Sequence, residues 1–266
     1  MVDDSPWKET GLQRGAKIAF GFMALLAVVS AVLVVVSAVD GDLAGVAGFS
    51  AGAIFFGHLV GFSVHMWWRP RRSMPAVTAV DGAVTFPFSA WTSYWLGSFM
   101  ILMVLVLVLI GSSGLLGGGG PGIVVAILAF GAAIYLGGHL VRLVFNRRGC
   151  LRLTPTRLEH HALGFTHRLP WDAVADVVPA EVNDAPLIIL MPVATAPVDV
   201  TFTWITRGPR KGLLLPSMAI RSVWLVDDPV TVYRTLRHYH SNPGHRVELA
   251  SGAAIDRIRQ DRLTAR

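Results

Sequence analysis

The sequence contains a single cysteine, Cys150, among 266 residues. One cysteine excludes an intramolecular disulfide and leaves no thiolate cluster for a structural zinc site. Charged residues are also scarce, at 15% of the chain, whereas hydrophobic residues reach 53% and the mean hydropathy is +0.55. These values fall outside the average soluble class and predict a membrane protein.

Sequence signatures of catalysis are missing as well. The chain has no His-Glu-x-x-His motif, nucleophile elbow or paired carboxylates, and helix capping explains Asp227-Asp228. The glycine-rich stretch 117–122 is not followed by Gly-Lys-Ser/Thr, so we interpret it as a flexible connection and not as a phosphate-binding loop. We therefore predict no enzymatic activity, no cofactor and no metal.

Long apolar runs dominate the first half of the chain, and each is long enough to cross a hydrocarbon core of about 30 Å as a helix. Val36-Ser37-Ala38 resembles a signal-peptide cleavage site. The first run is too long for a signal peptide, however, and a second run follows almost at once, which favours an uncleaved helix. The predicted organisation is a polar tail at 1–16, expected to fray, and four spans at about 17–39, 45–68, 91–116 and 123–145.

Small residues in the second span predict close helix packing. Gly48 and Gly52 form one GxxxG spacing, and Gly57 and Gly61 form another. Such spacing lets helix backbones approach closely where lipid supplies no hydrophobic effect. The partner helices belong either to this chain or to a second copy of it.

Basic residues predict the orientation. The 23 Lys and Arg exceed the 17 Asp and Glu, giving a net charge of +6, and several lie on membrane flanks while the turns at 40–44 and 111–122 carry none. The positive-inside rule therefore places both termini in the cytoplasm, at the inner membrane, and nucleic acid is not a predicted partner. These arginines either only set the topology or also attract anionic lipid headgroups. Each basic residue near the membrane surface contributes about 1 kcal/mol to such an attraction. The flanking residues are Arg69, Arg71, Arg72, Arg142, Arg147 and Arg148.

The connection at 69–90 carries the pattern of a β-hairpin, with Asp81-Gly82 as its turn. An isolated hairpin is marginal in water. We therefore expect it to join the edge of the soluble domain, which places Val84 and Phe86 near residues beyond 149.

The pattern of short strands followed by helices at 147–266 predicts an α+β domain, which is a small β-barrel or sandwich with C-terminal helices. One helix is expected at 229–240, capped by Asp228, with Val232, Leu236 and Tyr239 on its buried face. A second is expected at 246–263, burying Val247, Ala250, Ala254 and Ile258. The predicted strands are 150–154, 158–162, 165–170, 173–178, 187–193, 198–206 and 212–215.

Two short motifs carry a family resemblance. The segment LRLTPTRL at 151–158 and the segment LPWDAV at 169–174 resemble the opening of bacterial pleckstrin-homology-like (PH-like) domains. That resemblance implies a seven-strand barrel with a C-terminal helix that binds a peptide, protein or lipid, with no catalytic set. The family includes many multi-pass actinobacterial membrane proteins, and the preference for arginine over lysine suits a high-G+C bacterium. The layout is also loosely similar to the lipid-uptake coordinator proteins of mycobacteria.

Histidines are the polar candidates inside the membrane. His58 and His65 lie seven residues apart on one face of the second span, and His139 lies in the fourth span one turn from Arg142. A haem between His58 and His139, or an ion path, is geometrically conceivable. A neutral histidine bonded to serine or to a backbone carbonyl is the simpler interpretation.

The soluble part offers weaker candidates. His160 and His161 point to opposite faces of a strand, and His238 and His240 diverge on a helix, so neither pair readily shares a metal. A basic loop around Gly208-Pro209 is either a phosphate or acidic-peptide site or a solvated turn. Its basic residues are Arg207, Arg210 and Lys211.

We therefore predict a non-enzymatic inner-membrane adaptor or assembly factor whose cytoplasmic PH-like domain binds a protein or an anionic lipid. Such a protein would support a lipid-handling membrane complex. The expected partners are membrane lipids and either another membrane protein or a second copy of the chain. The alternative is an oligomeric small transporter or channel component that uses His58, His65 and His139.

Overall fold

The structure is a computed structural model, and it describes residues 6–7, 14–67, 75–145, 149–162, 164–182, 185–194, 199–202 and 217–263. The chain divides into two compact units. The helical unit contains Gly11–Arg69 and Trp91–Asn146. The sheet unit contains Met1–Thr10, Pro70–Ala90 and Arg147–Arg266, so three separate stretches of chain contribute to it.

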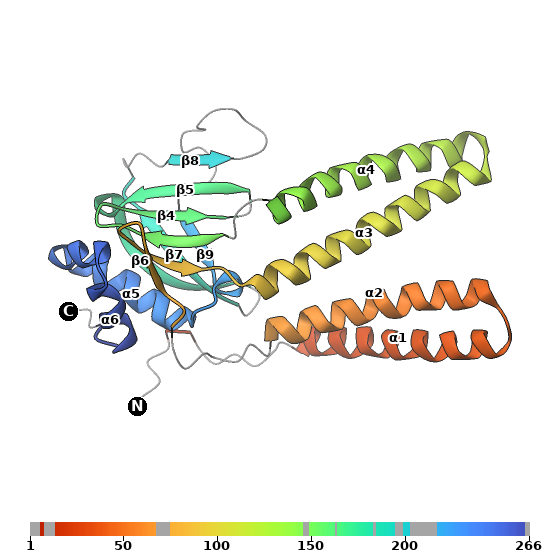
Figure 1. The fold of residues 1–266 in the computed structure, drawn as a ribbon, viewed down its shortest axis with the longest axis horizontal. Coiled ribbons are helices and arrows are strands. Elements are labelled where there is room, and N and C mark those ends of the chain that lie inside the picture. The colour runs from red at the N-terminus through yellow and green to blue at the C-terminus, as the bar shows by residue number, and fades with distance from the viewer. Residues whose placement is uncertain are drawn as a thin grey trace. The chain divides into compact units, whose positions relative to one another are not determined.

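The helical unit contains four long apolar helices, as predicted: α1 (Arg14–Val39), α2 (Leu43–Trp67), α3 (Ala90–Gly117) and α4 (Gly119–Phe145) (Figure 1). Each is long and apolar enough to cross a membrane. Helices α1 and α2 pack together through a tight turn in which Gly41 has a φ of 74°. Asp42 closes this turn because its carboxylate accepts a hydrogen bond from the N–H of Gly45 at 3.0 Å.

The glycine-rich connection is shorter than predicted. Helix α3 continues through Gly117 and α4 begins at Gly119, so Gly118 alone separates them. Gly118 and Gly119 have φ values of 67° and 74°, which glycine adopts without strain. Just before and after this turn, a Cβ on Gly114 would lie 2.7 Å from the carbonyl oxygen of Gly122. The glycines are therefore explained by a close helix crossing and not by a flexible loop.

The predicted small-residue contacts of α2 are found at two of the four glycines. A Cβ on Gly61 would overlap the indole ring of Trp95 on α3, and one on Gly52 would lie 3.1 Å from the hydroxyl of Ser30 on α1. Gly48 and Gly57 have no neighbour within 4 Å of such a Cβ. One glycine of each GxxxG pair thus faces another helix of this chain.

The sheet unit is built from two antiparallel sheets. The six-stranded sheet has the order β1-β2-β3-β4-β5-β8, and the three-stranded sheet has the order β6-β7-β9. Strand β9 was not predicted, and the predicted strand at 212–215 lies outside the described residues. The strands are β1 (Thr78–Val80), β2 (Ala83–Pro87), β3 (Cys150–Leu153), β4 (Arg157–His161), β5 (Phe165–Pro170), β6 (Val174–Val182), β7 (Ala185–Pro192), β8 (Asp199–Phe202) and β9 (Met218–Arg221).

The hairpin between α2 and α3 belongs to the six-stranded sheet. Asp81 and Gly82 have φ values of 49° and 68°, the two positive angles of a type I′ turn. Strand β2 pairs with β3, which follows α4 in the chain, and Val84 lies opposite Leu153 while Phe86 lies opposite Leu151. All four side chains are 0% exposed, so the expected addition of the hairpin to the sheet edge is confirmed.

Helix α5 (Pro229–Ser241) closes the core of the sheet unit and matches its predicted form. The carboxylate of Asp228 caps it by accepting from the N–H of Val230, and Val232, Leu236 and Tyr239 are fully buried. These three side chains join one hydrophobic cluster with residues from both sheets. The short 3-10 turns η1 (Trp171–Ala173) and η2 (Ser222–Trp224) follow β5 and β9.

The expected second C-terminal helix is wrong as a continuous element. A 3-10 segment, η3 (Pro243–Ala250), is followed by Ser251 and Gly252 and then by the short helix α6 (Ala253–Arg259). Val247 is 71% exposed, whereas Ala254 and Ile258 are buried. The 3-10 segment has three residues per turn, so it carries Val247 and Ala250 off the face that an α-helix would have buried.

Trp7, which lies in the predicted N-terminal tail, is held by the sheet unit. Trp7 is 6% exposed and belongs to the core cluster of the sheet unit. Its indole N–H donates to the carbonyl oxygen of Ala180 on β6 at 2.8 Å, and its ring meets that of Tyr233 on α5 edge-on at 5.6 Å. Trp7, although it precedes the first helix, therefore contributes to the same folded unit as β6 and α5.

Candidate functional site

A row of charged side chains crosses the outward face of the six-stranded sheet. Arg152 on β3 lies opposite Glu159 on β4, Glu159 lies opposite Arg168 on β5, and Arg168 lies opposite Asp199 on β8. Alternate residues of a strand point to opposite faces, so this row faces away from the core. The core-facing neighbours of the four are Leu151, Leu158, Leu169 and Val200, none more than 3% exposed.

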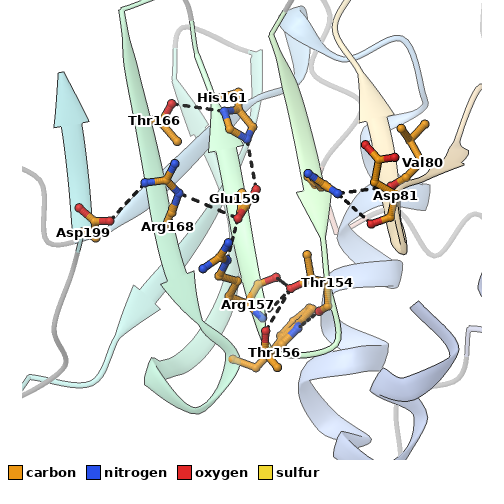
Figure 2. Close-up of polar contacts among 12 residues, drawn as sticks. Val80, Asp81, Thr154, Thr156, Arg157, Glu159, His161, Thr166, Arg168 and Asp199 are labelled. Carbon is orange, nitrogen blue, oxygen red and sulfur yellow. Dashed lines mark hydrogen bonds and ion pairs between the residues drawn. The ribbon is translucent and has the colours of Figure 1, made fainter. Parts of the chain in front are cut away.

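Glu159 is the centre of this charged row. Its carboxylate accepts a hydrogen bond from Nε of Arg157 at 2.7 Å, lies 3.3 Å from Nε2 of His161, and lies 3.9 Å from Nε of Arg168 (Figure 2). Burial alone would raise the pKa of Glu159. The hydrogen bonds and positive charges of His161 and Arg157 outweigh burial and hold that pKa below its usual value.

The flanks of the row connect it to both edges of the sheet. Nη1 of Arg168 lies 3.4 Å from the carboxylate of Asp199 on the edge strand β8. At the other side, Nη2 of Arg152 donates to the carbonyl oxygen of Asp81 at 3.0 Å, in the hairpin turn of β1 and β2 (Figure 2). The charged row therefore ties the hairpin, the central strands and β8 together.

The chemistry of the row suits recognition of charged groups. Glu159 remains ionised at neutral pH because its pKa is lowered, and arginine side chains do not release protons in proteins. Arg157 and Arg168 keep 52% and 38% of their side chains exposed, so both can add a second hydrogen-bond partner. Guanidinium groups bind carboxylates and phosphates through paired hydrogen bonds.

A second polar cluster lies between α5 and the C-terminal segments. Nε2 of His238 and Nδ1 of His245 are 3.1 Å apart, and Glu248 receives two hydrogen bonds of 2.8 Å from Arg257. The hydrogen bond from Arg257 lowers the pKa of Glu248 despite partial burial. Within the described ranges, no group of three or more histidine, cysteine or acidic residues could hold a metal ion.

Two of the histidines predicted to lie within the membrane are found at helix contacts. Nε2 of His58 is 2.6 Å from the hydroxyl of Ser98 on α3, and Nε2 of His65 is 3.3 Å from the hydroxyl of Thr92. The hydroxyl of Ser98 also lies 2.8 Å from the carbonyl oxygen of Tyr94 one turn earlier on α3, so it links His58 to the backbone of that helix. These contacts favour the simpler interpretation, in which the histidines join α2 to α3.

The other predicted site residues are only partly described. The ring of His139 packs edge-on against Tyr135 of the same helix, with 4.7 Å between ring centres. Arg142 lies in α4, and its side chain is outside the description. The remaining basic candidates also lie outside the described residues: Arg69, Arg71, Arg72, Arg147, Arg148, Arg207, Arg210 and Lys211.

The charged row itself was not among the residues predicted from the sequence. Arg152, Glu159 and Arg168 alternate with buried leucines, which marks them as outward-facing. Which of them become neighbours depends on strand register, which the sequence pattern does not supply.

The described residues define a chain with four helices able to cross a membrane and a separate antiparallel sheet unit with C-terminal helices. No protein-family model, curated protein or solved structure matches the chain. Function is therefore inferred from the chain's own geometry.

Proposed function

We propose that the protein is a non-enzymatic adaptor or assembly factor of the inner membrane, whose sheet unit binds a protein or an anionic lipid headgroup. One observation carries this proposal. The sheet unit takes Trp7 from before α1, strands β1 and β2 from between α2 and α3, and the rest from after α4. A domain that only needed a tether would require one connection, whereas this one is tied to an end of every helix.

The same construction supports the predicted topology. Trp7, the hairpin and the strands after α4 belong to one folded unit, so the helix ends that lead into it must lie on one side of the bilayer. Four spans arranged in this way form two hairpins whose turns lie on the opposite side. The basic residues flanking the helices support a cytoplasmic location of the sheet unit and of both termini.

The order of elements supports a PH-like domain. Among its described residues, the segment after α4 contains seven strands, β3 to β9, and α5 follows them. Two antiparallel sheets around a core closed by α5 agree with the barrel and C-terminal helix that the family resemblance implies. In that assignment the hairpin β1-β2 is an addition to the domain's edge.

The arginines of the charged row are the proposed ligand contacts. The test is purification of the full chain in mild detergent, followed by native mass measurement of bound proteins and anionic lipids. We expect a stoichiometric protein or a bound anionic lipid, and its loss in the double variant Arg157→Gln, Arg168→Gln. The matched control is Arg259→Gln on α6, which removes an exposed arginine elsewhere in the sheet unit and should retain the ligand.

Two results would contradict the proposal. Retention of the ligand by the double variant would exclude the charged row as the contact. Recovery of a homo-oligomer alone, with neither protein nor lipid bound, would favour the transporter alternative.

A further inference from the structure

The outward face of the three-stranded sheet is apolar. Strands β6, β7 and β9 direct Val177, Ile188 and Ile220 into the core, where none is more than 3% exposed. The alternate positions, on the other face, are apolar too except for Asp176 and Arg221, whereas a sheet with one solvated face normally carries polar residues throughout that face. These outward residues are Val178, Ala180, Val182, Leu187, Ile189, Met191 and Ala219.

The contrast with the six-stranded sheet makes this pattern informative. On the six-stranded sheet, the face away from the core carries the charged row through Glu159, and the other face carries mostly buried apolar residues, as expected for alternating side chains. On the three-stranded sheet, Leu187 is 8% exposed, while Val182 and Met191 towards the two ends of the face are 44% and 45% exposed. A continuous apolar patch of this kind marks an interaction surface.

Two opposite charges lie at diagonal corners of this apolar face. Asp176 on β6 lies opposite Met191, and Arg221 on β9 lies opposite Leu187. Both are exposed, and neither takes part in an ion pair among the described residues. Ile189 lies midway between them, because β7 is the central strand and Ile189 is two residues from both Met191 and Leu187.

This arrangement makes the face complementary to itself. A two-fold axis in the plane of the interface, perpendicular to the line from Asp176 to Arg221, exchanges the two corners. It brings each Asp176 against the partner's Arg221 and places the two copies of Ile189 together on the axis. A different protein partner would not require such symmetry, so the charge pattern favours a second copy of this chain.

We propose that this face is a homodimer interface in which two sheet units pack through their three-stranded sheets, with Ile189 at the two-fold axis. The seven outward apolar residues of this face are fewer than the about 20–30 residues per side of a standard interface. The dimer therefore forms among chains confined to one membrane and is weak in dilute detergent. This proposal concerns a different surface from the charged row and does not depend on the ligand proposed there.

The test is cysteine crosslinking of the full chain in membranes. In a Cys150→Ser background, Ile189→Cys places one thiol of each copy on the axis. Packed sheets lie ~10 Å apart, too far for a direct disulfide, so we expect a short bis-maleimide to link two copies of this chain. The matched control in the same background is Thr85→Cys, on the outward face of the six-stranded sheet, which should remain monomeric. Failure of Ile189→Cys to crosslink, equal crosslinking of both variants, or crosslinking to another protein would overturn the proposal.

Charge reversal tests the corner pairs. Asp176→Arg or Arg221→Asp, each added to Ile189→Cys, sets like charges against each other and should lower crosslinking at least about tenfold, because like-charge contacts cost more than 1.4 kcal/mol. Combining both reversals restores opposite charges and should restore crosslinking. All these positions are outward-facing, so the fold is retained. A double reversal that stays uncrosslinked would refute the Asp176–Arg221 pairing.

Discussion

His160 and His167 lie directly opposite each other on β4 and β5 and both face the core of the sheet unit. They are 5% and 1% exposed, and the ring of His160 packs edge-on against Phe88 and Phe165. Nδ1 of His160 and Nε2 of His167 have no hydrogen-bond partner among the described residues. Burial, reinforced by the charges of His167 and His161, lowers the pKa of His160 to about 4, and burial also lowers the pKa of His167.

This pair predicts acid sensitivity of the sheet unit. Below pH about 6.5 the unfolded chain protonates these histidines while folded His160 stays neutral down to about 4, so the unfolded state binds more protons. The free energy of unfolding should therefore fall by about 3 kcal/mol as the pH drops through that window. Denaturant unfolding of the full chain at pH 7.5, 6, 5 and 4 measures this effect.

The matched variants for that experiment lie next to each other on β4. His160→Leu removes the buried imidazole and should flatten the pH dependence between 6.5 and 4. His161→Gln, on the opposite face of the strand, should keep it. Equal pH slopes in the two variants would rule out His160 as the titrating group.

The pairing of β2 with β3 predicts a specific disulfide. Pro87 lies directly opposite Cys150, and residues so paired have Cα atoms about 4.5–5.5 Å apart, within the range of a disulfide. Pro87→Cys should therefore form an intramolecular bond with Cys150. Burial raises the pKa of the Cys150 thiol, so oxidation should be carried out at mildly alkaline pH.

Maleimide labelling checks this prediction. The Pro87→Cys chain should lose both free thiols on oxidation without forming dimers. Val80→Cys, on the outer edge strand β1, should keep two free thiols. Two reactive thiols in the oxidised Pro87→Cys chain would show that the hairpin does not join the sheet in this register.

Trp7 should contribute strongly to the stability of the sheet unit. Trp7→Ala removes a buried ring and should lower the free energy of unfolding by about 3–5 kcal/mol. Trp7→Phe keeps an aromatic ring but loses the hydrogen bond to Ala180. The loss of this bond should lower the free energy of unfolding by about 1 kcal/mol, in addition to the effect of the smaller ring. Denaturant unfolding measures both, with the exposed Val247→Ala as a control expected within about 0.5 kcal/mol of wild type. A neutral Trp7→Ala would mean that the N-terminal segment does not belong to the folded unit.

Two glycines of α2 should respond in opposite directions to alanine. Gly61→Ala forces a methyl group against the ring of Trp95, which is itself packed against His58, and should destabilise the helical unit by about 1–3 kcal/mol. Gly57→Ala meets no neighbour within 4 Å and should be neutral or stabilising by up to about 1 kcal/mol. Thermal aggregation in mild detergent compares them. Equal melting temperatures would contradict the α2–α3 contact.

Features determined locally could be predicted from the sequence. Helix lengths follow from apolar runs, the Asp81-Gly82 turn from the backbone angles it requires, and α5 from the Asp228 cap and the spacing of Val232 and Leu236. The addition of β2 to the domain edge could also be predicted, because an isolated hairpin is only marginally stable in water.

Features that depend on distant contacts could not be predicted in the same way. The neighbours of Glu159 are set by the register of β3, β4 and β5, and a shift of one residue would turn every side chain to the other face. Trp7 looked like part of a tail because its partners, Ala180 and Tyr233, lie far along the chain. Strand β9 is only four residues long and carries little pattern of its own.

The pairing of β2 with β3 also fixes an order of events during synthesis. The ribosome delivers β2 first, then α3 and α4, and only then β3. Strand β2 therefore remains without its sheet neighbour until both helices have been made. If α3 and α4 both cross a bilayer, β2 and β3 meet on the same side, whereas if only one of them crosses, the two strands lie on different sides and the sheet cannot close. Completion of this sheet is thus an internal check that membrane insertion has succeeded.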